Sequence, residues 1–463
     1  MDSGPPGPVD SAPLVIDAPA GDDPGRQKEC TFVRSGVRVT RMTVDTETRP
    51  LLAARHARAA VAVLFFTNGA LFANLLPRYP QIKEDLAIGN GAYGLAVAAF
   101  PAGAVTAGLA AGVLVRRMGS ARVAVLGTLL TGAGILAAGV APSVALFATA
   151  LFLAGAMDAL TDVAQNAHGL RVQRLYGRSI LNSFHAIWSI GAVTGGLMAA
   201  GAMSLDLSLG VHLTVSAVVL VAAAVAALRF CLPGPDSEPE EAGPERSEAE
   251  GARGTERAPG AEEARRAERA LGAEGARGTS RVGFVLAALV LIATAGTLVE
   301  DAGNSWAALY LGDALHASAA LAAWGFIALV GAQFIGRIIG DRLVDRFGQR
   351  AVARSGGLIT AVGMGLALAV PTLPGTVLGF ALAGFGVATL VPAAMHEADA
   401  LPGLKPGSGL TLVSWLMRLG FLLSPPIVGQ VADAAGLRTG LLVIPAAGVL
   451  VVLLAGVLRA RRG

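Results

Sequence analysis

A series of long apolar runs limits this chain to one kind of fold. About twelve such runs recur between Arg58 and Arg459, and short arginine-rich loops separate them. Each run is close to the ~20 residues that an α-helix needs to cross a bilayer. Inside hydrocarbon the backbone must satisfy its own hydrogen bonds, which leaves helices and closed barrels as spanning structures. Runs of this length indicate helices, so we expect an all-α polytopic membrane protein.

The runs form two groups of six, which predicts two six-helix bundles with both chain termini on the same side of the membrane. The first bundle is expected over 58–230 and the second over 282–459. The expected spans are 58–76, 92–115, 121–140, 143–166, 180–203, 209–230, 282–310, 319–340, 351–370, 375–395, 409–431 and 437–458.

Polar segments flank and join the bundles. Residues 1–57 are rich in Pro, Gly and Asp, and residues 231–281 are mostly Glu, Ala, Arg, Gly and Pro, with AEGARGT occurring twice. Neither segment has enough apolar side chains to fold, so we expect a disordered cytoplasmic tail and a disordered cytoplasmic linker. Residues 460–463 form a short C-terminal tail. Within the linker, 261–271 are expected to be transiently helical, and Met42 is a candidate translation start.

Composition excludes several classes of protein. With 54% hydrophobic residues, 15% charged residues and a mean hydropathy of +0.61, a chain of 463 residues lacks the surface charge of a soluble protein. The net charge of +3 comes from loop arginines, so no nucleic-acid partner is expected. Cys30 and Cys231 suit neither a disulfide framework nor a metal site. Without HExxH, GxSxG or P-loop motifs, we expect no enzyme activity, metal or cofactor.

Basic residues set the expected orientation. Most loop arginines fall on the side of the two termini, whereas Arg78, Lys83 and Arg438 fall on the opposite side. By the positive-inside rule the termini are cytoplasmic. We therefore expect a multi-pass protein of the cell's inner membrane, surrounded by lipid and monomeric.

Ionisable side chains inside the spans are the evidence for function, because each must face a cavity, a partner or a helix end. In the fourth span Asp158, Asp162 and Asn166 are four residues apart and share a helix face. Asp158 lies deep, so it is the expected site for substrate or a proton. Asp162 and Asn166 lie closer to the cytoplasm, where pairing with Arg117 or Arg171 to hold loops shut is an equal alternative.

The fifth and seventh spans add further candidates. His185 lies about one turn before Trp188, and a histidine in a membrane cavity can carry a proton, although a lone one is more often a packing residue. Glu300 and Asn304 share a face and form a pair suited to a proton and a polar solute. A break in the helix near Asn304 is expected, because Gly303 weakens it. Alternatively, Asp301, Trp306 and Tyr310 lie at the outer membrane interface as part of an aromatic belt. For Tyr310 we prefer this alternative.

Arg418 lies near the middle of the eleventh span. An unpaired guanidinium at that depth is costly, so we expect it to face the interior and bind a carboxylate, with Asp158 and Glu300 as partners. Trp415, about one turn earlier, is the expected stacking wall of the cavity. In the first span Asn68 is deep, uncharged and suited to hydrogen-bonding a solute.

Two charged loops indicate that the halves are related. The segment 335–350, IGRIIGDRLVDRFGQR, packs its charges against an apolar run and must turn at a membrane face. A weaker copy upstream, GVLVRRMGSAR, has leucine, arginine and glycine at the same relative places. The expected gating and loop residues are Arg117, Gly119, Asp162, Asn166, Arg337, Asp341, Arg342, Asp345, Arg346 and Gly348.

The later loop resembles the G-x-L-x-D-R-x-G-R-R loop that transporters of the major facilitator superfamily carry after their second and eighth helices. In the first copy Arg116 stands where the family has Asp, whereas the second copy has the Asp, at Asp345. Five stretches resemble the MosC-like bacterial permease branch: NLLPRYPQIKEDL, GAMDALTDVAQN, SFHAIWSIGA, EDAGNSWAALYL and SPPIVGQVADAAGLR. The resemblance covers about 58–459 and implies a proton-coupled, rocker-switch secondary transporter with its site between the halves.

Two functional classes remain open on these residues. We expect a transporter of a small polar or amphipathic solute, in which Glu300, Asp158 or His185 takes the proton and Arg418 sets the polarity of the cavity. Export is favoured over sugar import, because few amides face the cavity. The alternative is a non-transporting receptor or scaffold on the same fold, with the linker as its signalling element; the lack of a folded soluble domain argues against it.

Overall fold

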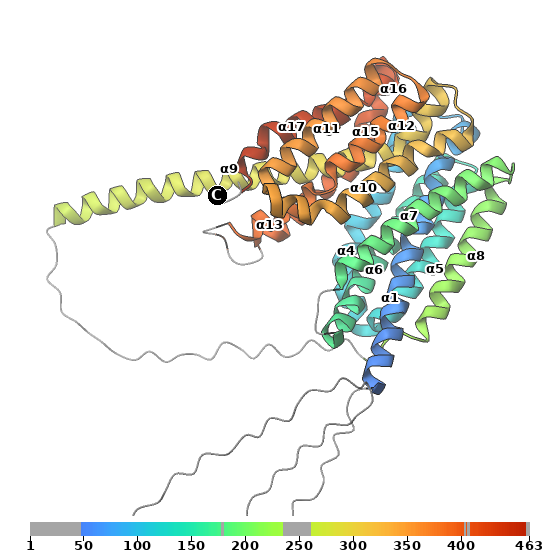
Figure 1. Ribbon diagram of the computed structural model, residues 1–463, viewed down its shortest axis with the longest axis horizontal. Helices are drawn as coiled ribbons and strands as arrows, with labels where there is room; N and C mark the ends of the chain where they lie inside the picture. The colour runs from blue at the N-terminus through green and yellow to red at the C-terminus, as the bar shows by residue number, and fades with distance from the viewer. Residues whose placement is uncertain (1–47, 177–179, 235–260, 402–403, 405–407, 460–463) are drawn as a thin grey trace, which may run out of the picture. The chain divides into compact units, whose positions relative to one another are not determined.

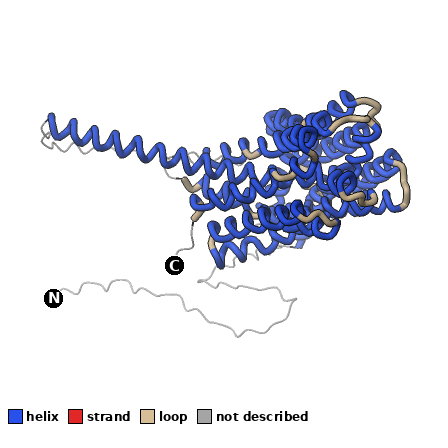
Figure 2. The backbone as a smooth tube through the Cα atoms, turned by 90° about the horizontal axis from the view of Figure 1, so that it is seen from above, coloured by secondary structure: helices blue, strands red, loops and turns tan. Residues whose placement is uncertain are grey.

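The computed structural model describes residues 48–176, 180–234, 261–401, 404 and 408–459. Within these ranges the chain consists of helices and loops and has no strand (Figure 2). Twelve helical segments in the described part are long and apolar enough to cross a membrane, which confirms the expected number of spans. The tail 1–47 and the linker residues 235–260 lie outside the described ranges.

The first bundle contains six spans, and several of them are built from more than one helix. Its elements are α1 (Thr48–Leu75), η1 (Leu76–Arg78), α2 (Tyr79–Asp85), α3 (Asn90–Val97), α4 (Ala99–Met118), α5 (Ser120–Gly139), α6 (Val144–Tyr176), α7 (Leu181–Ser204) and α8 (Leu209–Leu228). In Figure 1 these helices lie together, coloured blue to green.

The second bundle repeats this organisation, coloured yellow to red in Figure 1. Its elements are α9 (Ala261–Leu309), η2 (Tyr310–Ala314), α10 (Ala319–Phe347), α11 (Gln349–Ala369), α12 (Leu373–Val387), α13 (Leu390–Asp399), α14 (Ser408–Leu416), α15 (Arg418–Ala435), α16 (Leu437–Gly440), α17 (Val443–Leu454) and η3 (Ala455–Val457).

Two helices begin earlier than the sequence pattern indicates. Helix α1 starts at Thr48 and α9 at Ala261, so both extend beyond the apolar runs into segments expected to be tail and linker. Helix α9 also runs unbroken past Gly303, so the predicted break is wrong. A Cβ at Gly303 would overlap the Leu329 side chain of α10, and close packing therefore explains this glycine.

Backbone geometry shows that the two halves are related. Gly119 ends α4 with φ 87° and Gly348 ends α10 with φ 83°, and these are the glycines of the two charged loops. Ala87 and His316, with φ 50° and φ 52°, precede the same two spans and are separated by the same number of residues as the two glycines. Each half therefore enters and leaves its second span through the same pair of turns, in agreement with the expected repeat.

The two ends of the bundles can be named from these turns. The terminal side carries the loops at Gly119 and Gly348 and the end of the chain, where the Arg350 backbone N–H donates to the Arg459 carbonyl at 3.1 Å. The far side carries the opposite loops, among them those at Ala87 and His316.

Close helix packing between α1 and α7 uses glycine. Where α1 crosses α7, a Cβ at Gly69 would overlap the Trp188 carbonyl, and one at Gly191 would overlap the Phe66 carbonyl. The two backbones can approach each other only because both positions lack a side chain. This crossing fixes the position of the indole of Trp188 relative to α1.

Candidate functional site

A carboxyl group held by neutral donors lies in the first bundle. Asn68 of α1 donates from Nδ2 to Asp158 Oδ1 of α6 at 2.6 Å. Trp188 of α7 donates from Nε1 to Asn68 Oδ1 at 2.8 Å. The Asn68 side chain is buried, and its amide joins three helices. The structure therefore brings together three of the predicted site residues.

A second carboxyl group, in the other bundle, is held by an amide and a cation. Gln333 of α10 donates from Nε2 to Glu300 Oε2 at 2.7 Å. Arg337, one turn further along α10, places Nη2 3.6 Å from the same oxygen. The expected pairing of Arg418 with Asp158 or Glu300 is not formed, because these carboxyl groups have other partners.

A small cavity between the bundles joins the two groups. It measures about 30 Å³, and its walls include the indole of Trp188 on one side and the side chains of Glu300 and Asn304 on the other. The other lining residues are Gly69, Phe72, Ala73, Leu76, Ala192, Phe326 and Val330. A space of this size holds one or two water molecules, so a larger solute requires the bundles to move apart.

The far side of this cavity is closed by aromatic side chains. Tyr93 of α3 donates from its hydroxyl to the Ser305 carbonyl of α9 at 2.8 Å. Its ring also meets Trp306 edge to face, with 5.0 Å between ring centroids. Trp306 and Tyr310 are 0% and 1% exposed, so the predicted aromatic belt is wrong. Both side chains lie in the protein interior, and Trp306 packs against the opposite bundle.

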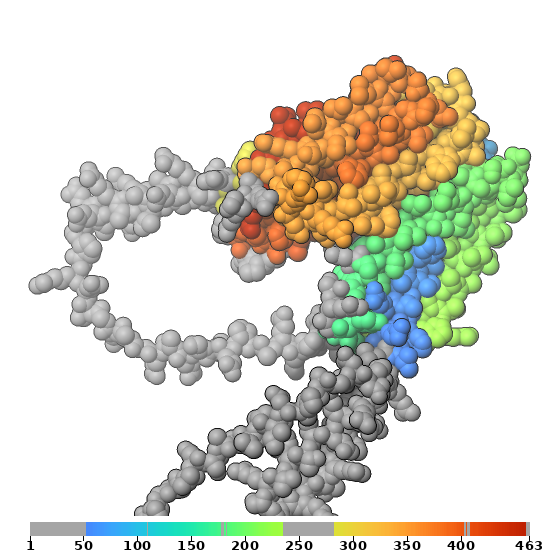
Figure 3. Space-filling model, viewed as in Figure 1, coloured from blue at the N-terminus to red at the C-terminus, as the bar shows by residue number. Residues whose placement is uncertain are grey.

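Polar contacts join the far-side ends of the two bundles. The carboxylate of Asp433 on α15 accepts hydrogen bonds from the backbone N–H groups of Asn90 and Gly91, at 2.9 and 2.8 Å. Lys83 lies 3.7 Å from Asp313. These contacts link the first turn of α3, and the end of α2, to the second bundle. Figure 3 shows the green part of the first bundle packed against the orange part of the second.

The remaining predicted residues lie toward the terminal side. Asp162 accepts from Asn166 Nδ2 at 3.0 Å and interacts electrostatically with His185 and Arg418. The Asp162 and His185 side chains are exposed, and Arg418 is half-buried. Arg171 donates instead to the Pro233 and Gly234 carbonyls at the start of the linker. Asp162 thus lies within electrostatic range of charged groups on both bundles.

Several predicted site and gating residues are exposed. Trp415, the predicted stacking wall of the cavity, is 52% exposed and lies two residues before Met417, where α14 gives way to α15. Exposed charged residues of the two terminal-side loops include Arg117, Asp341, Arg342, Asp345 and Arg346.

Three residues at this site were not anticipated from the sequence. Gln333, Tyr93 and Asp433 bind across helices or across bundles, yet each occurs singly in an apolar stretch. Gln333 carried a usable signal, because it stands one turn before Arg337 in a span and so shares its face. Asp433 stands three residues before Gly436, the spacing of Asp345 and Gly348.

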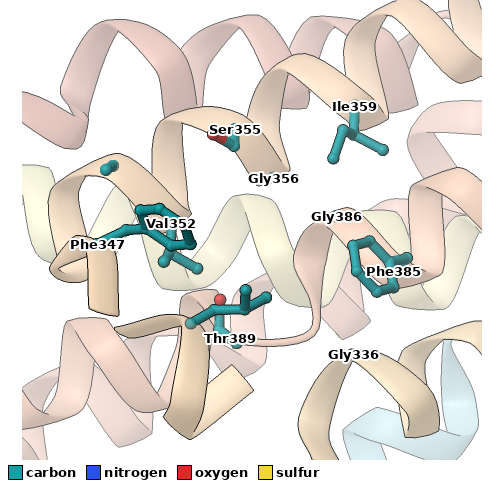
Figure 4. A pocket seen from close by; sticks show the side chains of 11 residues that line it. Gly336, Phe347, Val352, Ser355, Gly356, Ile359, Phe385, Gly386 and Thr389 are labelled. Carbon is teal, nitrogen blue, oxygen red and sulfur yellow. The ribbon is translucent and has the colours of Figure 1, made fainter. Parts of the chain in front are cut away.

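A larger cavity of about 280 Å³ lies within the second bundle, among α10, α11 and α12. Figure 4 shows its mainly apolar walls, in which Ser355 and Thr389 supply hydroxyls. It lies apart from the carboxyl groups described above, so we do not assign it to the candidate site. Among the described residues no cluster of His, Cys, Asp and Glu is suited to a metal ion.

The chain matches the family model described as Major Facilitator Superfamily over residues 61–300 and 286–463. It is 30% identical over 399 residues to the uncharacterized transporter y4wD of Sinorhizobium fredii, covering 86% of this chain and 97% of that one. It is 28% identical over 392 residues to the membrane protein MosC of Rhizobium meliloti, covering 85% and 88%.

Two solved structures share the fold. The nucleoside transporter NupG aligns with a TM-score of 0.62 at 13% identity, covering 86% of this chain and 97% of that one. A bacterial homolog of the human lysosomal transporter Spinster, in an inward-facing and occupied conformation, aligns with a TM-score of 0.62 at 15% identity, covering 88% and 96%. At these identities the likeness extends to the fold alone.

Proposed function

Because this chain belongs to the major facilitator superfamily and to its MosC-like branch, we propose that it exports a small solute by proton-coupled alternating access. Family membership makes it a membrane transporter of a small molecule and not an enzyme. In the proposal the terminal side faces the cytoplasm, the protein resides in the inner membrane, and it works as a monomer.

The cavity between the bundles carries this proposal. Alternating access needs a site that both halves share, and this cavity has Trp188 on one wall and Glu300 on the other. Contacts such as Tyr93 to Ser305 close its far side. Exposed Asp162 and His185 lie toward the terminal side. The arrangement supports a conformation in which solute enters from the cytoplasm.

Glu300 is the proposed coupling residue. When ionised it is stabilised by Arg337 and by the amide of Gln333. A hydrogen-bond donor or cationic group on the solute can bind this carboxylate only while Glu300 is ionised, and a proton on Glu300 displaces it. Proton and solute would then compete for Glu300, as an exchange of solute for protons requires. Asp158 and His185 are the secondary proton sites, and Asp162 with Arg418 sets the charge of the terminal-side opening.

The cavity walls favour an amphipathic solute over a sugar. Phe72, Trp188 and Phe326 provide aromatic surface, and Asn304 provides a carbonyl oxygen without a partner in the described structure. The amides of Asn68 and Gln333 are already bonded to carboxyl groups, so they do not offer the several free donors that a sugar's hydroxyls need. Nucleosides belong among the candidates because NupG transports them.

Thermal stabilisation of purified protein tests the solute class. A ligand that binds only the folded state adds about 2.7 kcal/mol when present at a hundred times its Kd. We expect a rise in Tm with an aromatic, amphipathic metabolite or drug, and a different rise at acidic and alkaline pH. The panel includes nucleosides, inositols, sugars, amino acids and organic acids. A rise confined to sugars would contradict the proposed amphipathic solute, and no rise with any compound would favour a receptor.

A further inference from the structure

Two neighbouring acids on α9 have opposite surroundings. Glu300 faces α10, where Gln333 and Arg337 bind it. Asp301 is 8% exposed, and its Oδ2 has no hydrogen-bond partner in the described structure. The proposed function uses Glu300 and leaves Asp301 without a role.

The groups around Asp301 supply no positive charge. Among the described residues, those that act on it are the hydroxyls of Ser305 and Ser424 and the carboxyl group of Glu300. The phenol groups of Tyr79 on α2 and Tyr93 on α3 interact electrostatically with Asp301. The nearest ion pair on this side, Lys83 with Asp313, is already complete. An ionised carboxylate in such a place would be buried without a cation, which is strongly unfavourable.

The hydroxyls beside Asp301 do not replace a cation. Ser305 and Ser424 are neutral partners, and Ser424 also donates to the Leu298 carbonyl, with 3.3 Å between the oxygens. Such partners offset only part of the cost of burying a charged carboxylate, and Oδ2 of Asp301 has no partner in the described structure. Asp301 therefore fits its surroundings as a neutral acid.

Asp301 also lies at the far-side closure. Ser305, four residues later, accepts the Tyr93 hydrogen bond, and Trp306 packs on the Tyr93 ring. The Tyr79 hydroxyl and the Trp306 Nε1 are buried there without partners in the described part. Separation of α3 from α9 would admit water to all of these groups. Water would satisfy the unpaired polar atoms and stabilise an ionised Asp301.

We propose that Asp301 is a proton-binding site of the far-side gate, occupied while the bundles are closed there and released when they separate. On opening, the carboxyl O–H bond breaks, the proton passes to water on the far side, and the carboxylate is solvated. On closing, the reverse step returns a proton to Asp301 before α3 and α9 meet. The inference rests on the proposed function only in that the gate opens during transport.

Distance measurements between spin labels test the proposal without any solute. We would label Leu205→Cys and Val370→Cys, which are 72% and 66% exposed on far-side loops of different bundles, in a Cys30→Ser, Cys231→Ser background. The protein is reconstituted in lipid nanodiscs. We expect a short distance in acidic buffer and a growing population of longer distances in alkaline buffer. Asp301→Asn, which cannot lose a proton, should keep the short distance in both.

Matched variants separate the gate from other effects. Asp313→Asn, a far-side carboxyl group that is paired with Lys83 and partly exposed, should retain the response to pH. Ser424→Ala removes a hydroxyl that favours the ionised carboxylate, so the gate should open at a higher pH. An unchanged response in Asp301→Asn, or a wild-type distance that does not respond to pH, would overturn the proposal. Failure of the solute panel would leave this measurement unaffected, so the two proposals fail separately.

Discussion

The two bundles hold their inward-facing carboxyl groups in different ways. In the first bundle Asp158 accepts a hydrogen bond from the amide of Asn68, which the indole of Trp188 orients. In the second bundle Glu300 has an amide donor, Gln333, and a guanidinium 3.6 Å away. One carboxyl group therefore has only a neutral hydrogen-bonding partner, and the other also has a cation.

This difference indicates a division of roles. Glu300 lies opposite Arg337, so its protonation changes the charge of the cavity and releases the guanidinium. A neutral donor adds no charge at Asp158, so its protonation changes less of the surroundings. Two carboxyl groups on one pathway can in this way serve as charge switch and structural anchor. Variants of their partners should separate these roles.

Removal of the cation should have the largest effect. Arg337→Gln leaves Glu300 without its positive partner, and we expect proton-driven flux to fall at least tenfold, about 1.4 kcal/mol in activation free energy. Flux is measured in proteoliposomes with the compound that raises the Tm. Arg354→Gln, an exposed arginine on α11, is the matched control and should retain flux. Equal losses in the two variants would show that Arg337 has no specific role as the cation beside Glu300.

Removal of the neutral donor should instead reduce stability. Asn68→Ala leaves both the Asp158 carboxyl group and the Trp188 N–H without a partner, at a cost of about 1–3 kcal/mol for a buried group. The free energy of unfolding is measured in detergent. Asn166→Ala, at a half-buried amide that bonds its own helix, should change it by less than about 0.5 kcal/mol. A larger loss at Asn166 would count against an anchoring role for Asn68.

The smallest expected effect concerns a feature that the bundles share. Gly119 and Gly348 have nearly the same positive φ, so Gly119→Ala and Gly348→Ala should each cost about 1 kcal/mol of unfolding free energy. Gly108→Ala, in a helix with open space around it, should be neutral or slightly stabilising. Unequal losses at the two loops would show that the repeat is broken there. Thermal denaturation of the three variants makes the comparison.

The fold was accessible from the sequence because hydrocarbon imposes a simple rule. Apolar runs of sufficient length must be helices, and the described part of the chain has the twelve that were expected. The loop glycines Gly119 and Gly348 were found by their spacing, and the structure gives both the same turn. Boundaries were less accessible: α1 and α9 continue into polar segments, where hydropathy carries no signal.

The partners of site residues were much harder to predict. Asp158, Glu300 and Arg418 stand out because a charged group in a span needs a partner, but sequence spacing identifies neighbours only within one helix. Gln333, which binds Glu300 from another helix, therefore escaped notice. Tyr310 was misplaced for a related reason, since an aromatic residue near a span's end suits a lipid interface as well as a buried contact.

Proton coupling through Glu300 is the central claim, and one substitution tests it directly. Wild-type protein in proteoliposomes should accumulate the stabilising compound against its gradient when a pH gradient is imposed. Glu300→Gln keeps the side-chain size but cannot exchange a proton, so it should fold with a similar Tm, still equilibrate the compound, and lose pH-driven accumulation. Unchanged accumulation in Glu300→Gln would contradict the account.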